Sequence, residues 1–203
     1  MSWNTSLFLF LNAATRPDTW SLYLLEGLAD LPVFLTPVLL AALWVVGASG
    51  RRPALIAAGA AVFVGQGTNW LLGLVWFEPR PFMAGIGHTW MAHIPDNGFP
   101  SDHATLAWSL GLALVLTEAS VRWGLVACLS GAAAGWARVR LGVHFPVDVL
   151  AAVPVGMLAA MVARGMLPPI RVWVTPLAEQ AYEVVLERLP ALRQRNPDNL
   201  PRA

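Results

Sequence analysis

Residues 20–46 read WSLYLLEGLADLPVFLTPVLLAALWVV and contain only two charged side chains, Glu26 and Asp30. A helix of about 20 mostly apolar residues crosses a hydrocarbon core of ~30 Å, so this stretch predicts a membrane-spanning helix. Pro32 and Pro37 lie inside it and predict a bend. Residues 20–46 therefore predict a helix that is surrounded by lipid, which places the chain among membrane proteins.

The rest of the chain repeats this pattern. Of its 203 residues, 57% are hydrophobic and 12% are charged, whereas soluble domains carry roughly 25% charged residues. Further apolar stretches lie at 53–75, 101–119, 123–136 and 146–166, separated by segments rich in Gly, Pro and Arg. We predict an all-α transmembrane bundle of about five spans, forming one membrane-embedded domain over residues 1–167.

Both ends of the chain differ from the spans. Residues 3–14 are apolar but too short to cross a bilayer, and Arg16 and Asp18 follow them, which predicts an N-terminal interfacial segment. Residues 168–203 are more polar and place apolar side chains at near-helical spacing. We expect a C-terminal tail that is cytoplasmic or lies on the membrane surface.

The arginines predict an orientation. With five spans, one side of the membrane holds Arg51, Arg52, Arg122, Arg164, Arg171 and Arg188. Basic residues accumulate on the cytoplasmic side, so the loop at 76–100 is expected outside. Arg80 and Arg138 then lie on the outer side, against the bias, which indicates a specific role for them.

Composition also excludes several classes. The formal net charge is only +1 and no basic run is interleaved with aromatics, so nucleic acid is not an expected partner. The single cysteine, Cys128, lies in an apolar stretch and can form neither an intramolecular disulfide nor a cysteine zinc site. The absence of paired interrupted spans weakens a transporter interpretation.

Three short segments converge on the predicted outer face: Arg80-Pro81, Pro100-Ser101-Asp102-His103, and the stretch from Arg138 to Asp148. Ser101 stands at a helix N-cap, where free backbone N–H groups and the helix dipole attract anions. The planar guanidinium groups of Arg80 and Arg138 suit phosphate oxygens and neutralise charge in a transition state. These residues predict a phosphate site.

Two histidines predict chemistry at that site. We expect His144 and His103 on opposite sides of the anion, one to attack phosphorus and the other to protonate the leaving oxygen. Asp148 follows His144 by four residues, close to one helical turn, and is expected to orient its imidazole.

Together, Arg80-Pro81, Pro100 to His103, and the Arg138-x5-His144-x3-Asp148 spacing resemble the type 2 phosphatidic acid phosphatase superfamily. The sequences WFEPRPF at 76–82 and FPSDHA at 99–104 resemble those of bacitracin-resistance-type undecaprenyl pyrophosphate phosphatases. The resemblance extends over about residues 20–165.

This resemblance implies a nucleophile, His144, that forms a phosphohistidine, a general acid, His103, and an orienting carboxylate, Asp148. The phosphate is expected at Arg80, Ser101, Asp102 and Arg138, with no metal or other cofactor. The implied substrate is undecaprenyl diphosphate, a polyprenyl diphosphate converted to the monophosphate and inorganic phosphate, which recycles the cell-wall carrier lipid. The protein would be a multi-pass component of the bacterial cytoplasmic (inner) membrane, in contact with its lipids, with its site facing the periplasm or exterior.

The chain departs from the superfamily pattern at three positions. Relatives usually carry a lysine seven residues before the Arg80 equivalent, but Gly73 stands there and the chain has no lysine. Asp102 replaces a frequent glycine and Ala137 a frequent serine. Arg140 is a candidate to supply the missing phosphate contact.

Other interpretations are open at this point. The same motif serves phosphatases for phosphatidylglycerophosphate, phosphatidate or lipid A, because it recognises phosphate and leaves the lipid to other residues. A non-catalytic anion-binding protein or transporter could use the same arginines, and a membrane scaffold would need none of them. His88 and His93 are expected in a solvated or gating role outside the site, and Glu78 in a local ion pair with the arginine motif.

Overall fold

The structure, a computed structural model, describes residues 1–188. In chain order its α-helices are α1 (Trp3–Leu11), α2 (Thr19–Val46), α3 (Arg52–Val75), α4 (Asp102–Leu116), α5 (Val121–Arg140), α6 (Pro146–Gly165), α7 (Leu167–Pro169) and α8 (Thr175–Arg188). No strand occurs in these residues, and the one isolated bridge joins Pro79 and Asn97. The prediction of an all-α fold is confirmed.

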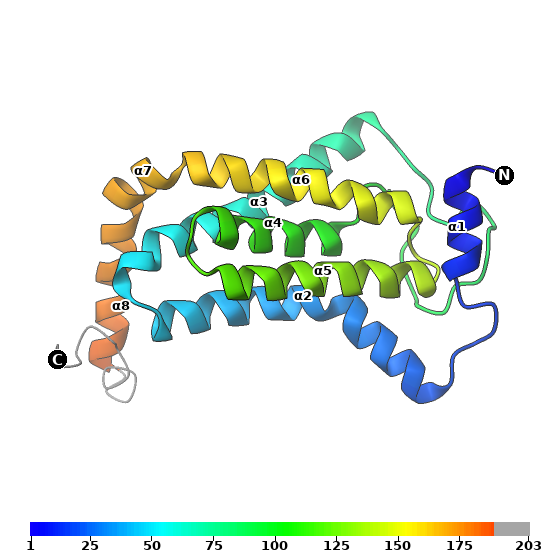
Figure 1. Ribbon diagram of the computed structural model, residues 1–203, viewed down its shortest axis with the longest axis horizontal. Coiled ribbons are helices and arrows are strands. Elements are labelled where there is room, and N and C mark those ends of the chain that lie inside the picture. The colour runs from blue at the N-terminus through cyan, green and yellow to red at the C-terminus, as the bar shows by residue number, and fades with distance from the viewer. Residues whose placement is uncertain (189–203) are drawn as a thin grey trace.

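The long helices α2 to α6 run side by side along the molecule, and α1 and α8 lie across its opposite ends (Figure 1). Three helical stretches are long and apolar enough to cross a membrane: Thr19–Val46, Ser49–Val75 and Pro146–Gly165. The helix α4 is apolar but shorter, with 15 residues. Membrane crossing by α4 and α5 stays a prediction.

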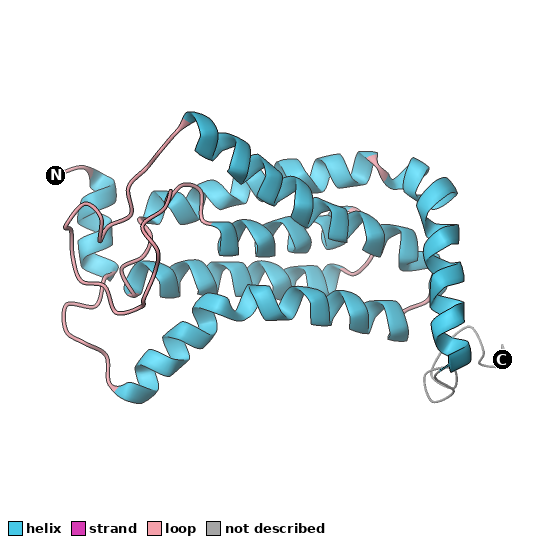
Figure 2. Ribbon diagram, turned by 180° about the vertical axis from the view of Figure 1, so that it is seen from behind, coloured by secondary structure: helices cyan, strands magenta, loops and turns pink. Residues whose placement is uncertain are grey.

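The connections gather at the two ends of the bundle. The 76–101 loop, the α5–α6 turn and the α1–α2 linker share one end, where Figure 2 shows the long loop beside α1. The α2–α3 and α4–α5 links and the end of α6 share the other. The three motif segments therefore lie at one end of the bundle, and the arginines that are expected on the cytoplasmic side lie at the other end.

Close packing of small residues brings the central helices together. The helix α4 contacts α3, α5 and α6, and Gly111 faces Cys128 and Gly124 on α5 so closely that a Cβ at Gly111 would lie 2.5 Å from the Cys128 sulfur. Small residues allow helix backbones to approach in this way inside membranes. Cys128 is a buried packing residue, as expected.

The helix that contains the predicted fourth span is longer than its apolar stretch. We expected the span to end at residue 136, but α5 continues to Arg140, because arginine is a good helix former and a cation in the last turn interacts favourably with the helix dipole. Only residues 141–145 remain between α5 and α6, and Gly142 makes the turn with φ +84°. Arg138 is thus held by a helix rather than by a loop.

The N-terminal segment packs on this turn. Phe8 of α1 is fully buried and its ring lies 5.1 Å from that of Phe145. The Asn12 amide donates to the carbonyls of His88 and Arg140 at 2.9 and 3.1 Å. Its location at a membrane interface stays a prediction, but the segment also closes one end of the bundle.

The tail continues as helix through α7, a π-helical segment (Ile170–Val174) and α8. Arg52 at the start of α3 pairs with Glu179 of α8 at 3.3 Å, which fixes α8 across the end of the bundle. The expected tail also includes residues 189–203, which lie outside the described residues.

Candidate active site

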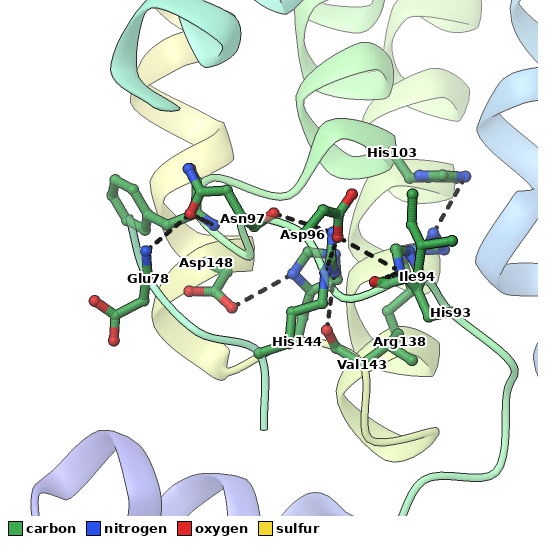
Figure 3. A network of polar contacts seen from close by, with 12 residues as sticks. Glu78, His93, Ile94, Asp96, Asn97, His103, Arg138, Val143, His144 and Asp148 are labelled. Atoms are coloured by element: carbon green, nitrogen blue, oxygen red, sulfur yellow. Dashed lines mark hydrogen bonds and ion pairs between the residues drawn. The ribbon is translucent and has the colours of Figure 1, made fainter. Parts of the chain in front are cut away.

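The three motif segments meet at the end of the bundle that carries the long loop (Figure 3). The Ser101 N–H donates to the Asp148 carbonyl at 3.0 Å, which joins the N-terminus of α4 to the first turn of α6. Arg80 donates through Nη1 to the Val143 carbonyl at 3.0 Å. Residues far apart in the chain are thereby fixed in one cluster.

His144 is held as a buried, oriented imidazole. Its Nδ1 lies 3.4 Å from Asp148 Oδ2, and that oxygen also accepts from the Phe145 N–H at 2.8 Å. Burial, together with the nearby charges of Arg80 and Arg138, lowers the pKa of His144 well below its usual value. With its proton on Nδ1, the neutral ring leaves Nε2 as a potential nucleophile.

Arg80 lies against that nitrogen. Its Nη1 is 2.9 Å from His144 Nε2, its Nε donates to Asp96 Oδ1 at 2.6 Å, and its Nη2 donates to the Asn97 carbonyl at 3.1 Å. The ion pair expected between Glu78 and the arginine motif is wrong, because the carboxylate partner of Arg80 is Asp96. Glu78 accepts instead from the Trp76 indole at 3.2 Å.

Ser101 and Arg138 contribute buried polar atoms without hydrogen-bond partners in residues 1–188. These atoms are Ser101 Oγ and Arg138 Nε and Nη1, in side chains that are 0% and 2% exposed. Ser101 occupies the N-cap of α4, but its hydroxyl does not cap the helix. Buried groups of this kind are rare, and an anionic ligand would satisfy all of them.

His103 stands one residue into α4 and faces Arg138 (Figure 3). Its Nε2 lies 3.3 Å from Arg138 Nη2 and 3.3 Å from Asp30 Oδ1. Each histidine of the predicted site therefore lies against an arginine: His144 against Arg80 and His103 against Arg138. This arrangement can bind a phosphate, attack it and protonate its leaving group.

Comparison with known proteins agrees with this geometry. Residues 54–170 match the PAP2 superfamily. A Bacillus subtilis (strain 168) protein named undecaprenyl-diphosphatase BcrC is 34% identical over 152 residues, which are 75% of this chain and 77% of that protein. The chain belongs to the PAP2 superfamily.

Solved structures share the fold. The crystal structure of Aquifex aeolicus LpxE has a TM-score of 0.65 at 21% identity and covers 80% of this chain and 95% of its own. A transmembrane PAP2-type phosphatidylglycerolphosphate phosphatase from Bacillus subtilis has a TM-score of 0.59 at 19% identity, over 84% and 85%. The predicted family is confirmed, and the relatives support a lipid phosphatase in a bacterial membrane.

In this PAP2 protein an asparagine side chain lies next to Gly73, the position at which relatives usually carry a lysine. A Cβ on Gly73 would lie 3.1 Å from Asn97 Nδ2, so the asparagine amide occupies the adjacent space. Asn97 Nδ2 donates to the carbonyls of Trp76 and Phe99, and Oδ1 accepts from the N–H groups of Glu78 and Phe99. The amide thus fastens together both ends of the loop that carries Arg80.

Arg140 does not replace the lysine, and that suggestion is wrong. Its Nη1 donates to the Leu11 carbonyl at 3.1 Å and holds α1. Asp102 accepts from Asn69 Nδ2 at 2.8 Å and borders a cavity of about 450 Å³ that Gly73 and Asn97 also line. Contact between Asp102 and phosphate stays a prediction.

The two loop histidines differ in position. His88 stacks on Trp90, with ring centroids 5.6 Å apart, and lies outside the site as expected. His93 Nδ1 lies 3.7 Å from Asp96 Oδ1, at the edge of the cluster around Arg80. Asp30, Asp96 and Asn97 were not among the predicted site residues, and no local spacing distinguishes them in the sequence.

Proposed function

We propose that this protein removes the terminal phosphate of undecaprenyl diphosphate at the outer face of the bacterial cytoplasmic membrane and so recycles the cell-wall carrier lipid. The observation that carries the proposal is a buried, carboxylate-oriented His144 beside buried donors of Ser101 and Arg138 that have no hydrogen-bond partner in residues 1–188. The name of the Bacillus subtilis relative supports the choice of lipid.

In the first step, His144 Nε2 attacks the terminal phosphorus and the bond to the bridging oxygen breaks. Arg80 Nη1 must first leave Nε2, to which it is hydrogen-bonded at 2.9 Å. A phosphate oxygen then becomes its new acceptor, so binding of the substrate exposes the nucleophile. Arg138 and the N-terminus of α4 stabilise charge on the equatorial oxygens.

His103 protonates the departing oxygen as undecaprenyl phosphate leaves. In the second step, water attacks the phosphohistidine, and a proton from this water passes to His103 and replaces the one that His103 had donated. The phosphorus–nitrogen bond breaks, inorganic phosphate is released and His144 returns to its starting state. The cycle consumes one water molecule and needs no redox partner.

The test is phosphate release in detergent, with chelator present, by wild-type protein, His144→Ala and His103→Ala. We expect release by the wild type and a loss of at least about 100-fold in each variant, because each removes a group that acts in the transition state. His88→Ala is the matched control, since it removes a histidine of the external loop that lies outside the site.

Substrate choice is measured on the same preparation. Phosphatidylglycerophosphate, phosphatidate and a lipid A phosphate are assayed beside undecaprenyl diphosphate, and the highest kcat/KM is expected for the diphosphate. A higher value for another lipid would keep the phosphatase and reassign its substrate. If no lipid releases phosphate while inorganic phosphate still binds to His144→Ala, the protein is an anion binder and the proposal is wrong.

A further inference from the structure

One carboxylate from outside the three motif segments reaches the site. Asp30 of α2 places Oδ1 3.3 Å from His103 Nε2 and 3.6 Å from Arg138 Nη1. The Asp30 side chain is 40% exposed, whereas that of His103 is 25% and that of Arg138 is 2% exposed. The Asp30 carboxylate is thus more exposed than its two partners. In the proposed reaction these partners are the general acid, His103, and a phosphate ligand, Arg138.

Packing of α2 on the last turns of α5 sets this position. Ala29 and Ala137 belong to one buried cluster and are both 0% exposed. The following residue on each helix, Asp30 and Arg138, forms the ion pair. Small side chains at 29 and 137 therefore permit the close approach that brings the carboxylate to the site.

A bend in α2 accompanies the contact. Pro32 lacks an N–H and cannot donate to the carbonyl of Leu28, which weakens the helix just after Asp30. Figure 1 shows the N-terminal part of α2 at an angle to the rest of the helix. Asp30 lies two residues before Pro32, so its position depends on the shape of α2 and on the packing of α2 against α5.

We propose that Asp30 is a positioning residue for His103, holding the proton-bearing Nε2 where a leaving oxygen will arrive. This role rests on the proposed phosphatase function. The other charged or titratable groups that act on His103 are Arg138 on α5 and Arg80 and His93 of the external loop. Asp30 is the group of opposite sign among them, and a general acid must carry its proton before the bond breaks.

The two contacts of His103 Nε2 fit the two halves of the reaction. A protonated Nε2 can donate to Asp30 but cannot accept from Arg138, whereas a deprotonated Nε2 can accept from Arg138 Nη2. Donation to the leaving oxygen therefore converts the first contact into the second. Water attack returns the proton to Nε2 and restores the contact with Asp30.

The experiment compares steady-state hydrolysis of undecaprenyl diphosphate by full-length wild type, Asp30→Asn, Asp30→Glu and Glu26→Gln in detergent. Asp30→Asn keeps the size of the side chain and removes its charge. We expect kcat to fall about tenfold with KM within about twofold, a part of the contribution of a general acid. Asp30→Glu should recover most of kcat, and Glu26→Gln, which removes a carboxylate one turn earlier on α2, should match the wild type.

The outcomes separate this role from others. Equal kcat values for Asp30→Asn and Glu26→Gln would overturn it, and so would a lower KM or higher kcat, which would show that Asp30 competes with phosphate. Low activity in both Asp30 variants with a lowered unfolding temperature would make the residue structural. An inactive wild type would instead overturn the proposed function, and this role with it.

Discussion

Two buried arginines at opposite ends of the bundle have different surroundings. Arg52, 3% exposed, pairs with Glu179 at 3.3 Å and packs against the rings of Trp44 and Tyr182, 5.3 and 5.0 Å from their centroids. Arg138, 2% exposed, has Asp30 at 3.6 Å and His103 at 3.3 Å. Its Nε and Nη1 have no hydrogen-bond partner in residues 1–188.

The two arginines differ in their neighbours: Arg52 contacts side chains that join helices, whereas Arg138 lies beside His103 in the predicted phosphate site. Aromatic faces and a carboxylate surround the Arg52 cation and join α8 to α2 and α3, which favours the folded state. At Arg138, the burial of Nε and Nη1 without a hydrogen-bond partner in residues 1–188 carries a penalty, because a buried polar group without a partner loses its hydration. An anion would reverse that penalty.

The largest effect is expected from Arg138→Ala. We predict that kcat/KM falls about 1,000-fold, since one donor to the transition-state charge is removed, while the unfolding temperature stays equal or rises because a poorly paired buried cation is lost. Phosphate release and thermal unfolding in detergent measure the two quantities. Arg122→Ala, in the exposed first turn of the same helix, is the control; a rate for Arg138→Ala within threefold of it would contradict the comparison.

A smaller loss is expected from Asn97→Ala. The substitution removes the amide contacts to Trp76, Glu78 and Phe99 that hold the loop carrying Arg80. Small displacements of a catalytic group lower rates steeply, so we expect kcat/KM to fall about 30-fold. An unchanged rate would mean that the Arg80–Asp96 ion pair alone is sufficient to position the loop.

Arg52→Gln tests the other end of the comparison. Loss of two cation–π contacts should lower the free energy of unfolding by ~2 kcal/mol, and the ion pair adds little because Glu179 is 37% exposed. Denaturation in detergent measures the change, and kcat of the folded protein should match the wild type. A reduced kcat at unchanged stability would show that the two ends are coupled.

The smallest effect concerns pH. The pKa of His144 in the folded protein lies well below the ordinary 6.5, so below pH 6.5 the unfolded chain binds a proton that the folded chain does not. Stability present at pH 7.5 is therefore lost on acidification, by up to ~1.4 kcal/mol per pH unit from this group. Unfolding temperatures at pH 7.5, 6.5 and 5.5 should fall more for the wild type than for His144→Gln. For Arg52→Gln the unfolding temperature should fall with pH as steeply as for the wild type. Equal pH dependence in all three proteins would contradict the low pKa of His144.

The sequence predicts the fold well where the signal is local. Apolar runs and prolines locate α2, α3 and α6 within a few residues, because lipid requires a continuous apolar surface. The end of α5 was missed because Arg138 and Arg140 resemble loop residues. These arginines also receive contacts from α1, α2 and α4, which the local pattern does not include.

The site divides in the same way. His144 and Asp148 are four residues apart, and their contact follows from one helical turn. Asp30 and Asp96 come from a bent helix and a long loop, and their partners lie 16 to 108 residues away in the chain. Their contribution depends on the packing of α2 against α5 and on the path of the loop, which become visible only in three dimensions.

The hydrogen bond from Ser101 to Asp148 also bears on how the protein matures. It joins the start of α4 to the start of α6, so the cluster cannot close until the sixth helix has been synthesised and has packed against its neighbours. A nascent chain that ends after α5 has both arginines and Ser101 but lacks His144. During biosynthesis Arg80, Ser101 and Arg138 are thus made first, but the contacts of Arg80 with Val143 and His144 and of Ser101 with Asp148 form only when the rest of the cluster follows.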